Sequence, residues 1–177
     1  MTALIHGSAV LAAAGPGYEP TRWDSVALAE VTAAAALAGL LVVAASINIR
    51  RIIELPGVVA RLGGTLALFT GALVICSEAL IPGLSRPALG TAVALTGTAQ
   101  AVAVIRYSGG QHTEAAHRRG TLTTATAALA SAVMLTFAGI SYALGAGGGL
   151  YWLAPGVLIA FTVGLVHAWV ALVEILR

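Results

Sequence analysis

Lysine is absent from this chain of 177 residues, and cysteine occurs once, at Cys76. Charged residues make up only 9% of the sequence, against about 25% in ordinary soluble domains. A single cysteine excludes an internal disulfide and any metal cluster built from several thiolates. Because Cys76 lies within an apolar run, we expect it to be a buried packing residue. The scarcity of charge excludes an ordinary soluble domain.

The motifs of common soluble enzymes are also missing. There is no glycine-rich phosphate loop and no nucleophile elbow. The segment HTEAAH carries His112 and His117, but zinc proteases place their histidines four apart, with Glu next to the first. Since His167 is the only histidine in a long apolar run, haem held by two histidines is not expected either. We therefore expect no enzyme, no cofactor and no metal site.

Hydrophobic residues, by contrast, make up 59% of the chain and gather in five long runs. A membrane-spanning helix needs about 20 consecutive apolar residues, and each run has that length. The sequence predicts an all-α transmembrane bundle, with residues 1–25 as an N-terminal arm and 26–177 as the membrane domain. The expected spans are about 26–47, 62–81, 87–105, 122–144 and 151–175.

The nine arginines predict how the bundle is oriented. Membrane proteins carry an excess of basic residues in their cytoplasmic loops. Only Arg22 and Arg86 fall on the side of the N-terminal arm, whereas the other seven fall on the opposite side: Arg50, Arg51, Arg61, Arg106, Arg118, Arg119 and Arg177. We expect a multi-pass protein of the cell membrane, with the N-terminus and its arm outside and the C-terminus inside. Because the arginines form no single patch, nucleic acid is not an expected partner.

Small residues recur every four positions along several of the expected spans. In lipid, helices associate through close packing, which small residues permit. The predicted packing positions are Gly63, Ala67 and Gly71 in one span, and Gly156, Ala160, Gly164 and Ala168 in the last. The last span has the most regular face, so we expect it to be the packing spine of the bundle. Small faces left over would favour a homo-oligomer, although abundant Ala and Gly could produce the same spacing.

Polar residues within the spans fall at two depths. Glu30 and Glu78 lie near the outer boundary, whereas the inner half holds Asn48, Gln100, His167 and Glu174. Ionisable groups inside a membrane are costly unless paired or hydrated, so Glu30, Glu78 and His167 are candidates for binding an ion or proton. The alternatives are that the two glutamates reach the headgroups or pair with Arg22 and Arg86, that His167 bonds to a polar residue of another helix, and that Glu174 reaches the inner interface.

Two stretches resemble a family of small actinobacterial membrane proteins of unknown function. They are the segment from Trp23 through SINIRRIIELPG at 46–57, and GGGLYWLAPGVLIAFTVGLVHAWVALVEILR at 147–177. Some members of that family are labelled as modulators of an FtsH-type membrane protease. The resemblance implies a polytopic membrane protein but no chemistry.

The function expected from the sequence is a homo-oligomeric bundle in the lipid bilayer with a channel-like or ion-handling role. The alternative is an accessory or regulatory subunit that packs against another membrane protein, such as a membrane protease. The small-residue faces fit both hypotheses, whereas the acidic residues favour the first.

Overall fold

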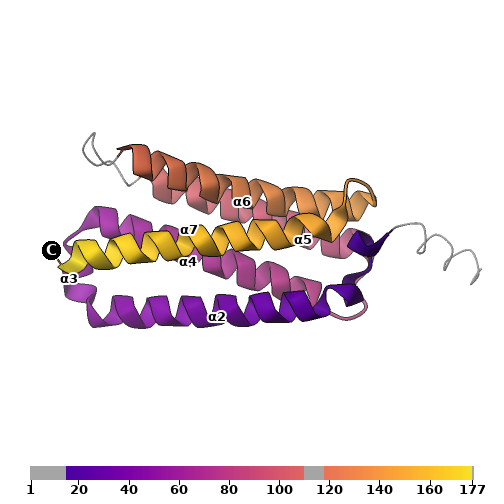
Figure 1. Ribbon diagram of the computed structural model, residues 1–177, viewed down its shortest axis with the longest axis horizontal. Helices are drawn as coiled ribbons and strands as arrows, with labels where there is room; N and C mark the ends of the chain where they lie inside the picture. Colours follow the sequence, from indigo (N-terminus) through magenta and orange to yellow (C-terminus); the bar gives the residue numbers. More distant parts are fainter. Residues whose placement is uncertain (1–14, 110–117, 177) are drawn as a thin grey trace, which may run out of the picture.

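The computed structural model describes residues 15–109 and 118–176, which form helices and no strand. The elements, in order, are η1 (Pro16–Tyr18), η2 (Pro20–Arg22), α2 (Asp24–Ile47), α3 (Ile49–Ile53), α4 (Pro56–Ala79), α5 (Arg86–Gly109), α6 (Arg118–Leu144), η3 (Gly149–Trp152) and α7 (Leu153–Leu176). Five of the helices, α2, α4, α5, α6 and α7, are long and apolar enough to cross a membrane. The predicted all-α bundle of five spans is therefore confirmed (Figure 1).

The second span begins earlier than expected. The sequence predicts that this span starts near residue 62, but α4 already begins at Pro56. Proline at the first position of a helix is favourable, because the N–H that it lacks would have no partner there. As a consequence, Arg61 lies inside α4 and not in a loop. The preceding connection is also helical, since α3 occupies residues Ile49–Ile53.

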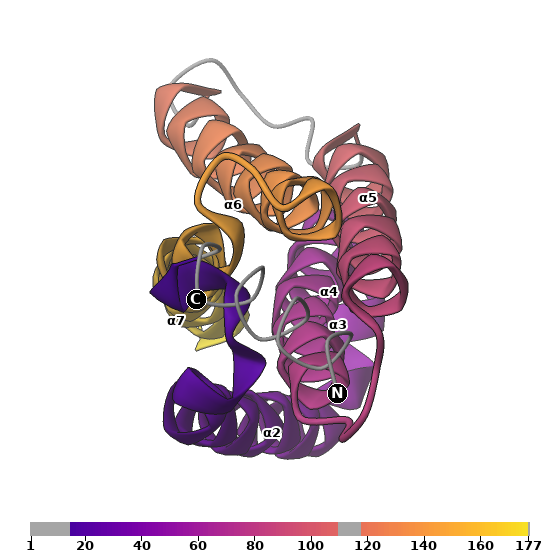
Figure 2. The ribbon, with the colours of Figure 1, turned by 90° about the vertical axis from the view of Figure 1, so that its right-hand side faces the viewer.

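The central helix is α4, not the last span as the sequence predicted. It packs against α2, α5 and α7, whereas α6 packs against α5 and α7. The end-on view shows α4 between α2 and the α5–α6 pair (Figure 2). Half of the apolar window of α4 is buried, compared with 39% for the last span and 22% for α2. α4 thus links α2 to the rest of the bundle and is the most buried of the five spans.

The small-residue face of α7 is used within the chain. A β-carbon at Gly156 would lie 2.9 Å from Cγ of Leu135 in α6, and one at Gly164 would lie 2.7 Å from Cζ of Phe69 in α4. Ala160, between them, is fully buried. Since interior packing leaves no room for an added carbon at such distances, these residues let α7 approach both neighbours. Ala168, at the end of this face, is half-buried.

The small face of α4 is directed towards α5. A β-carbon at Gly63 would meet the ring of Tyr107, 3.0 Å from Cδ1, and one at Gly71 would lie 2.8 Å from Cδ of Gln100. Ala67, between the two glycines, is half-buried. The two glycines therefore make room for two large side chains of α5.

The two ends of the bundle differ in composition. One, here called the aromatic end, gathers Tyr18, Trp23, Tyr151 and Trp152. The other, the arginine-rich end, carries Arg50 and Arg51 of α3 and Arg106 near the end of α5. The antiparallel course of the helices brings α3 and the C-terminus together at this second end (Figure 1).

The aromatic end is closed by residues 15–23 and the turn between α6 and α7. The amide of Gly148 donates to the hydroxyl of Tyr18 at 2.8 Å, and the indole of Trp23 donates to the carbonyl of Pro16 at 3.0 Å. Ser141 accepts from the amide of Gly149 at 2.8 Å. Gly148 has a φ of 105°, which side chains other than glycine rarely adopt. The glycine-rich turn between α6 and α7 is thus part of a hydrogen-bonded cap over the bundle.

Candidate functional site

Glu30 lies between α2 and α4 and is almost enclosed, with an exposed fraction of 8%. Ala27 and Ala34, about one turn away on the same helix, belong with Cys76 of α4 to one buried apolar cluster. Within residues 15–109 and 118–176, one hydrogen bond reaches the carboxyl group: the thiol of Cys76 donates to Oε2 at 3.5 Å. A thiol is a weak donor, so Glu30 is a carboxyl group in apolar surroundings with little compensation.

Glu78 occupies the opposite side of α4, where it faces α5. The hydroxyl of Thr96 donates to Oε1 of Glu78 at 2.7 Å. The second oxygen, Oε2, is buried and has no hydrogen-bond partner in the described part of the chain. Buried polar atoms are seldom left unpaired in proteins, and those that are call for an explanation.

The two glutamates do not share one site. Cys76, which contacts Glu30, and Glu78 are two residues apart in α4. At 3.6 residues per turn their side chains point about 200° apart around the helix axis. The sequence left open whether Glu30 and Glu78 meet, and the structure places them on opposite sides of α4.

Arg22 and Arg86, which lie towards the aromatic end, have partners other than the two glutamates. Arg22 forms its ion pair with Glu19, and Arg86 lies over the ring of Tyr18, with Cζ 5.6 Å from the centroid. Among residues 15–109 and 118–176, no ion pair includes Glu30 or Glu78. The pairing considered from the sequence, in which Arg22 and Arg86 neutralise the glutamates, is not observed.

The predicted inner polar residues make no hydrogen bond to one another among the described residues. The amide of Asn48, the residue that follows α2, donates to the carbonyl of Ala44 in the last turn of α2 at 3.1 Å. Gln100 is buried against Gly71, and neither polar atom of its amide has a partner in the described residues. His167 is 8% exposed, and neither of its nitrogens has a described partner. None of the interhelical bonds considered for His167 is therefore present among the described residues.

Glu174 has a partner that the sequence analysis missed. Nη1 of Arg61 in α4 lies 2.6 Å from Oε2 of Glu174 in α7. Only 8% of the Arg61 side chain is exposed. The sequence analysis places Arg61 in a loop, where no pairing with a residue of a span is expected. Pro56 is the residue from which this pair could have been predicted. If Pro56 is taken as the first residue of a helix, Arg61 lies in the second turn of that helix.

His112 and His117, the two histidines of the segment HTEAAH, lie outside the residues that the structure describes. Within the described part, no group of three or more His, Cys, Asp or Glu side chains could hold a metal ion. What the arrangement offers chemically is one buried and one half-buried carboxyl group towards the aromatic end, each with oxygen atoms that could accept a proton or a small cation.

The comparisons with known proteins add no relative from which a role could be transferred. No protein-family model, no curated protein and no solved structure matches the chain.

Proposed function

We propose that this chain forms a homo-oligomeric bundle in the cell membrane and handles protons or small cations in a channel-like manner. The carboxyl groups of Glu30 and Glu78 are the proposed binding groups. The observation that carries the proposal is that Glu30 is buried and Glu78 is half-buried with its Oε2 enclosed, while neither has a cationic partner among the described residues. Acidic residues inside a membrane bundle commonly mark ion or proton sites, because an uncompensated carboxyl group is otherwise costly there.

The different surroundings of the two carboxyl groups support sites of unequal affinity. Among the residues that the structure describes, Glu78 has a strong donor in Thr96 and one unpaired oxygen, whereas Glu30 has the thiol of Cys76 as its one donor. A cation or proton at Glu78 would satisfy the unpaired Oε2. We expect removal of the Glu78 carboxylate to have the larger effect.

The test is flux through purified protein in liposomes, with a pH-sensitive dye in one arm and a sodium-sensitive dye in the other. We expect flux above empty liposomes in one arm, reduced in Glu78→Gln and, to a smaller extent, in Glu30→Gln. The matched control is Glu54→Gln, because Glu54 is an exposed residue whose partner, Arg51, is also exposed. Silence of the wild type in both arms would contradict the proposal, as would equal flux in all variants.

The oligomer is supported by the outer surface of α5 and α6. Two adjoining hollows of about 310 and 370 Å³ lie there and share Thr98, Thr136 and Ile140. Small and hydroxyl side chains line the hollows together with large apolar ones such as Leu95 and Phe137, and such a surface suits close approach of another helix. Thr98→Trp should fill them and lower the oligomeric state measured by mass photometry in detergent, while the exposed neighbour Ala99→Trp should not.

The second candidate is an accessory or regulatory subunit of another membrane protein, such as the FtsH-type membrane protease named in the labels of some members of the family that the chain resembles. The same hollows favour it, because a helix of a different protein could occupy them. The two candidates differ in what crosslinks at Thr98. A photoreactive side chain there should yield homodimers under the first proposal and a heavier heterologous product under the second.

The proposed orientation places the N-terminus outside and the arginine-rich end at the cytoplasm. Its support is the uneven distribution of arginine between the two ends. Fusion of a fluorescent protein to the C-terminus should give fluorescent cells, whereas fusion of alkaline phosphatase at the same place should be inactive. The reverse pattern would contradict this orientation.

A further inference from the structure

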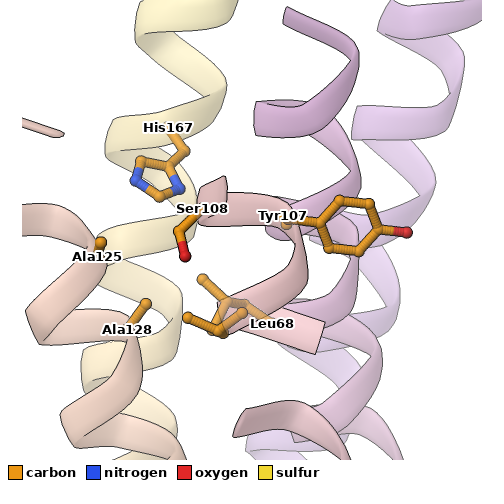
Figure 3. A pocket seen from close by; sticks show the side chains of 8 residues that line it. Leu68, Tyr107, Ser108, Ala125, Ala128 and His167 are labelled. Carbon is orange, nitrogen blue, oxygen red and sulfur yellow. The ribbon is translucent and has the colours of Figure 1, made fainter. Parts of the chain in front are cut away.

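A small cavity lies towards the arginine-rich end, where α4, α5, α6 and α7 meet. Its volume is about 20 Å³. Leu68, Val104 and Ala128 supply apolar walls, and Ser108 and His167 supply polar atoms. In the close view, the imidazole of His167 and the hydroxyl of Ser108 border the same space, whereas the ring of Tyr107 points away from it (Figure 3).

His167 needs a hydrogen-bond partner that the described residues do not supply. Its side chain is more than nine-tenths buried, and both Nδ1 and Nε2 are without a partner there. A neutral imidazole has one N–H donor and one acceptor nitrogen. Leaving such a buried group unpaired costs about 1–3 kcal/mol. A molecule in the cavity would relieve that cost.

Ser108 offers the second polar contact. Its hydroxyl donates to the carbonyl of Ile105 at 3.0 Å, so the oxygen keeps lone pairs that can accept. Two of the packed helices carry a charged pair, Arg61 of α4 and Glu174 of α7, which are bound to each other, and α5 carries Arg106 two residues before Ser108. The cavity thus faces one hydroxyl and one imidazole.

The volume restricts the occupant. One water molecule needs about 10–15 Å³ when the volume is measured for its centre, as well as two to four polar partners. The cavity has room for one water and not for a hydrated ion. A metal ion is disfavoured because no group of three His, Cys, Asp or Glu ligands occurs among the described residues.

We infer that this cavity binds a single water molecule, held between the imidazole of His167 and the hydroxyl of Ser108. The water satisfies one ring nitrogen and fills the gap between four helices. It also gives a buried imidazole a partner for proton exchange. This inference stands apart from the proposed function, because the site would exist whether or not ions cross the bundle.

The test is water-edited solid-state NMR of the full chain in lipid bilayers. Replacing His6, His112 and His117 by Gln leaves His167 as the only ¹⁵N-labelled imidazole. We expect magnetisation to pass from water to the His167 ring as rapidly as it does for a directly hydrogen-bonded pair. Transfer no faster than spin diffusion through the protein would overturn the inference.

Two variants at Ser108 test whether the water is held by its hydroxyl. Ser108→Val removes the hydroxyl and fills the cavity, so rapid transfer should be lost; Ser108→Ala, which fits without strain, should weaken it if the valine variant fails to fold. Thr162→Val is the matched control, since Thr162 is exposed and its hydroxyl bonds only within α7, to the carbonyl of Leu158. Unchanged transfer in both Ser108 variants would also overturn the inference.

Discussion

Arg61 and Glu174 join α4 to α7 through an ion pair with 2.6 Å between Nη1 and Oε2. The two partners are unequally placed, because 8% of the Arg61 side chain is exposed and 34% of the Glu174 side chain. Arginine stays protonated in proteins. Glu174 therefore compensates a charge that would otherwise be buried alone at the arginine-rich end.

Glu174→Gln should destabilise the bundle by about 2 kcal/mol, less than the 3–5 kcal/mol of a fully buried pair because water reaches Glu174. The free energy of unfolding can be measured by titrating SDS into dodecylmaltoside micelles and following circular dichroism. Glu54→Gln removes the carboxylate of the exposed Arg51–Glu54 pair, which is 3.6 Å long. That control should change the free energy by less than about 0.5 kcal/mol.

The double variant Arg61→Met, Glu174→Gln distinguishes a stranded charge from a lost contact. Removing both charges should recover most of the stability, because the main cost of the single change is the unpaired guanidinium. If the double variant is as unstable as Glu174→Gln, the explanation in terms of a buried unpaired charge is wrong.

The five spans could be predicted because hydropathy depends only on which residues follow one another. The Arg61–Glu174 pair could not be predicted once α4 was assumed to start near residue 62. The depths of Glu30 and Glu78 also follow from chain position, at about 1.5 Å per residue. Which neighbour each faces depends on how α4 is rotated against α2 and α5, and hydropathy carries little information on this because most residues of α4 are apolar.

The contact between Gly164 and Phe69 gives a second prediction. Gly164→Ala should destabilise the bundle by about 1–3 kcal/mol, as overpacking of a well-filled core does, because the added methyl group would meet the Phe69 ring. The measurement is again the free energy of unfolding in mixed micelles. Gly39→Ala in α2 is the matched control, since nothing lies within 4 Å of a β-carbon there, and it should not destabilise.

Phe69→Leu should rescue Gly164→Ala in part, because the smaller side chain makes room for the methyl group. A penalty that is the same with Phe and with Leu at position 69 would show that the contact is not its cause.

The cap at the aromatic end depends on one hydroxyl. Ser141 donates to the carbonyl of Ala146 at 2.5 Å and accepts from the buried amide of Gly149 at 2.8 Å. Ser141→Ala should cost about 1–3 kcal/mol, because the amide is left without a partner. Hydrogen exchange of the Gly149 amide should accelerate accordingly.

Ser77→Ala is the comparison for the cap, since Ser77 is exposed and bonds only to the carbonyl of Leu73 in its own helix. It should leave both stability and the exchange of Gly149 unchanged. Exchange that stays slow in Ser141→Ala would mean that the cap is held by other contacts.

The last prediction concerns Gln100, whose replacement should affect the stability of the bundle and the flux of ions in different ways. Its amide is buried against Gly71 with neither polar atom paired among the described residues. Gln100→Met keeps the length of the side chain and removes the unpaired groups, so stability should be unchanged or rise by up to about 1 kcal/mol. A buried polar group that lowers stability is retained more readily where function needs it. If Gln100 serves ion or proton passage, flux in liposomes should fall in the same variant.

Ser131→Ala provides the contrast, because the buried hydroxyl of Ser131 donates to the carbonyl of Gly156 at 2.7 Å. Losing that bond between α6 and α7 should lower stability by about 1 kcal/mol. Both free energies are measured under the same micelle conditions, alongside flux. A clear loss of stability in Gln100→Met would contradict the prediction, since it would show that the amide has a partner in the membrane. Unchanged flux with unchanged stability would instead make Gln100 a neutral core residue and remove it from any path for ions.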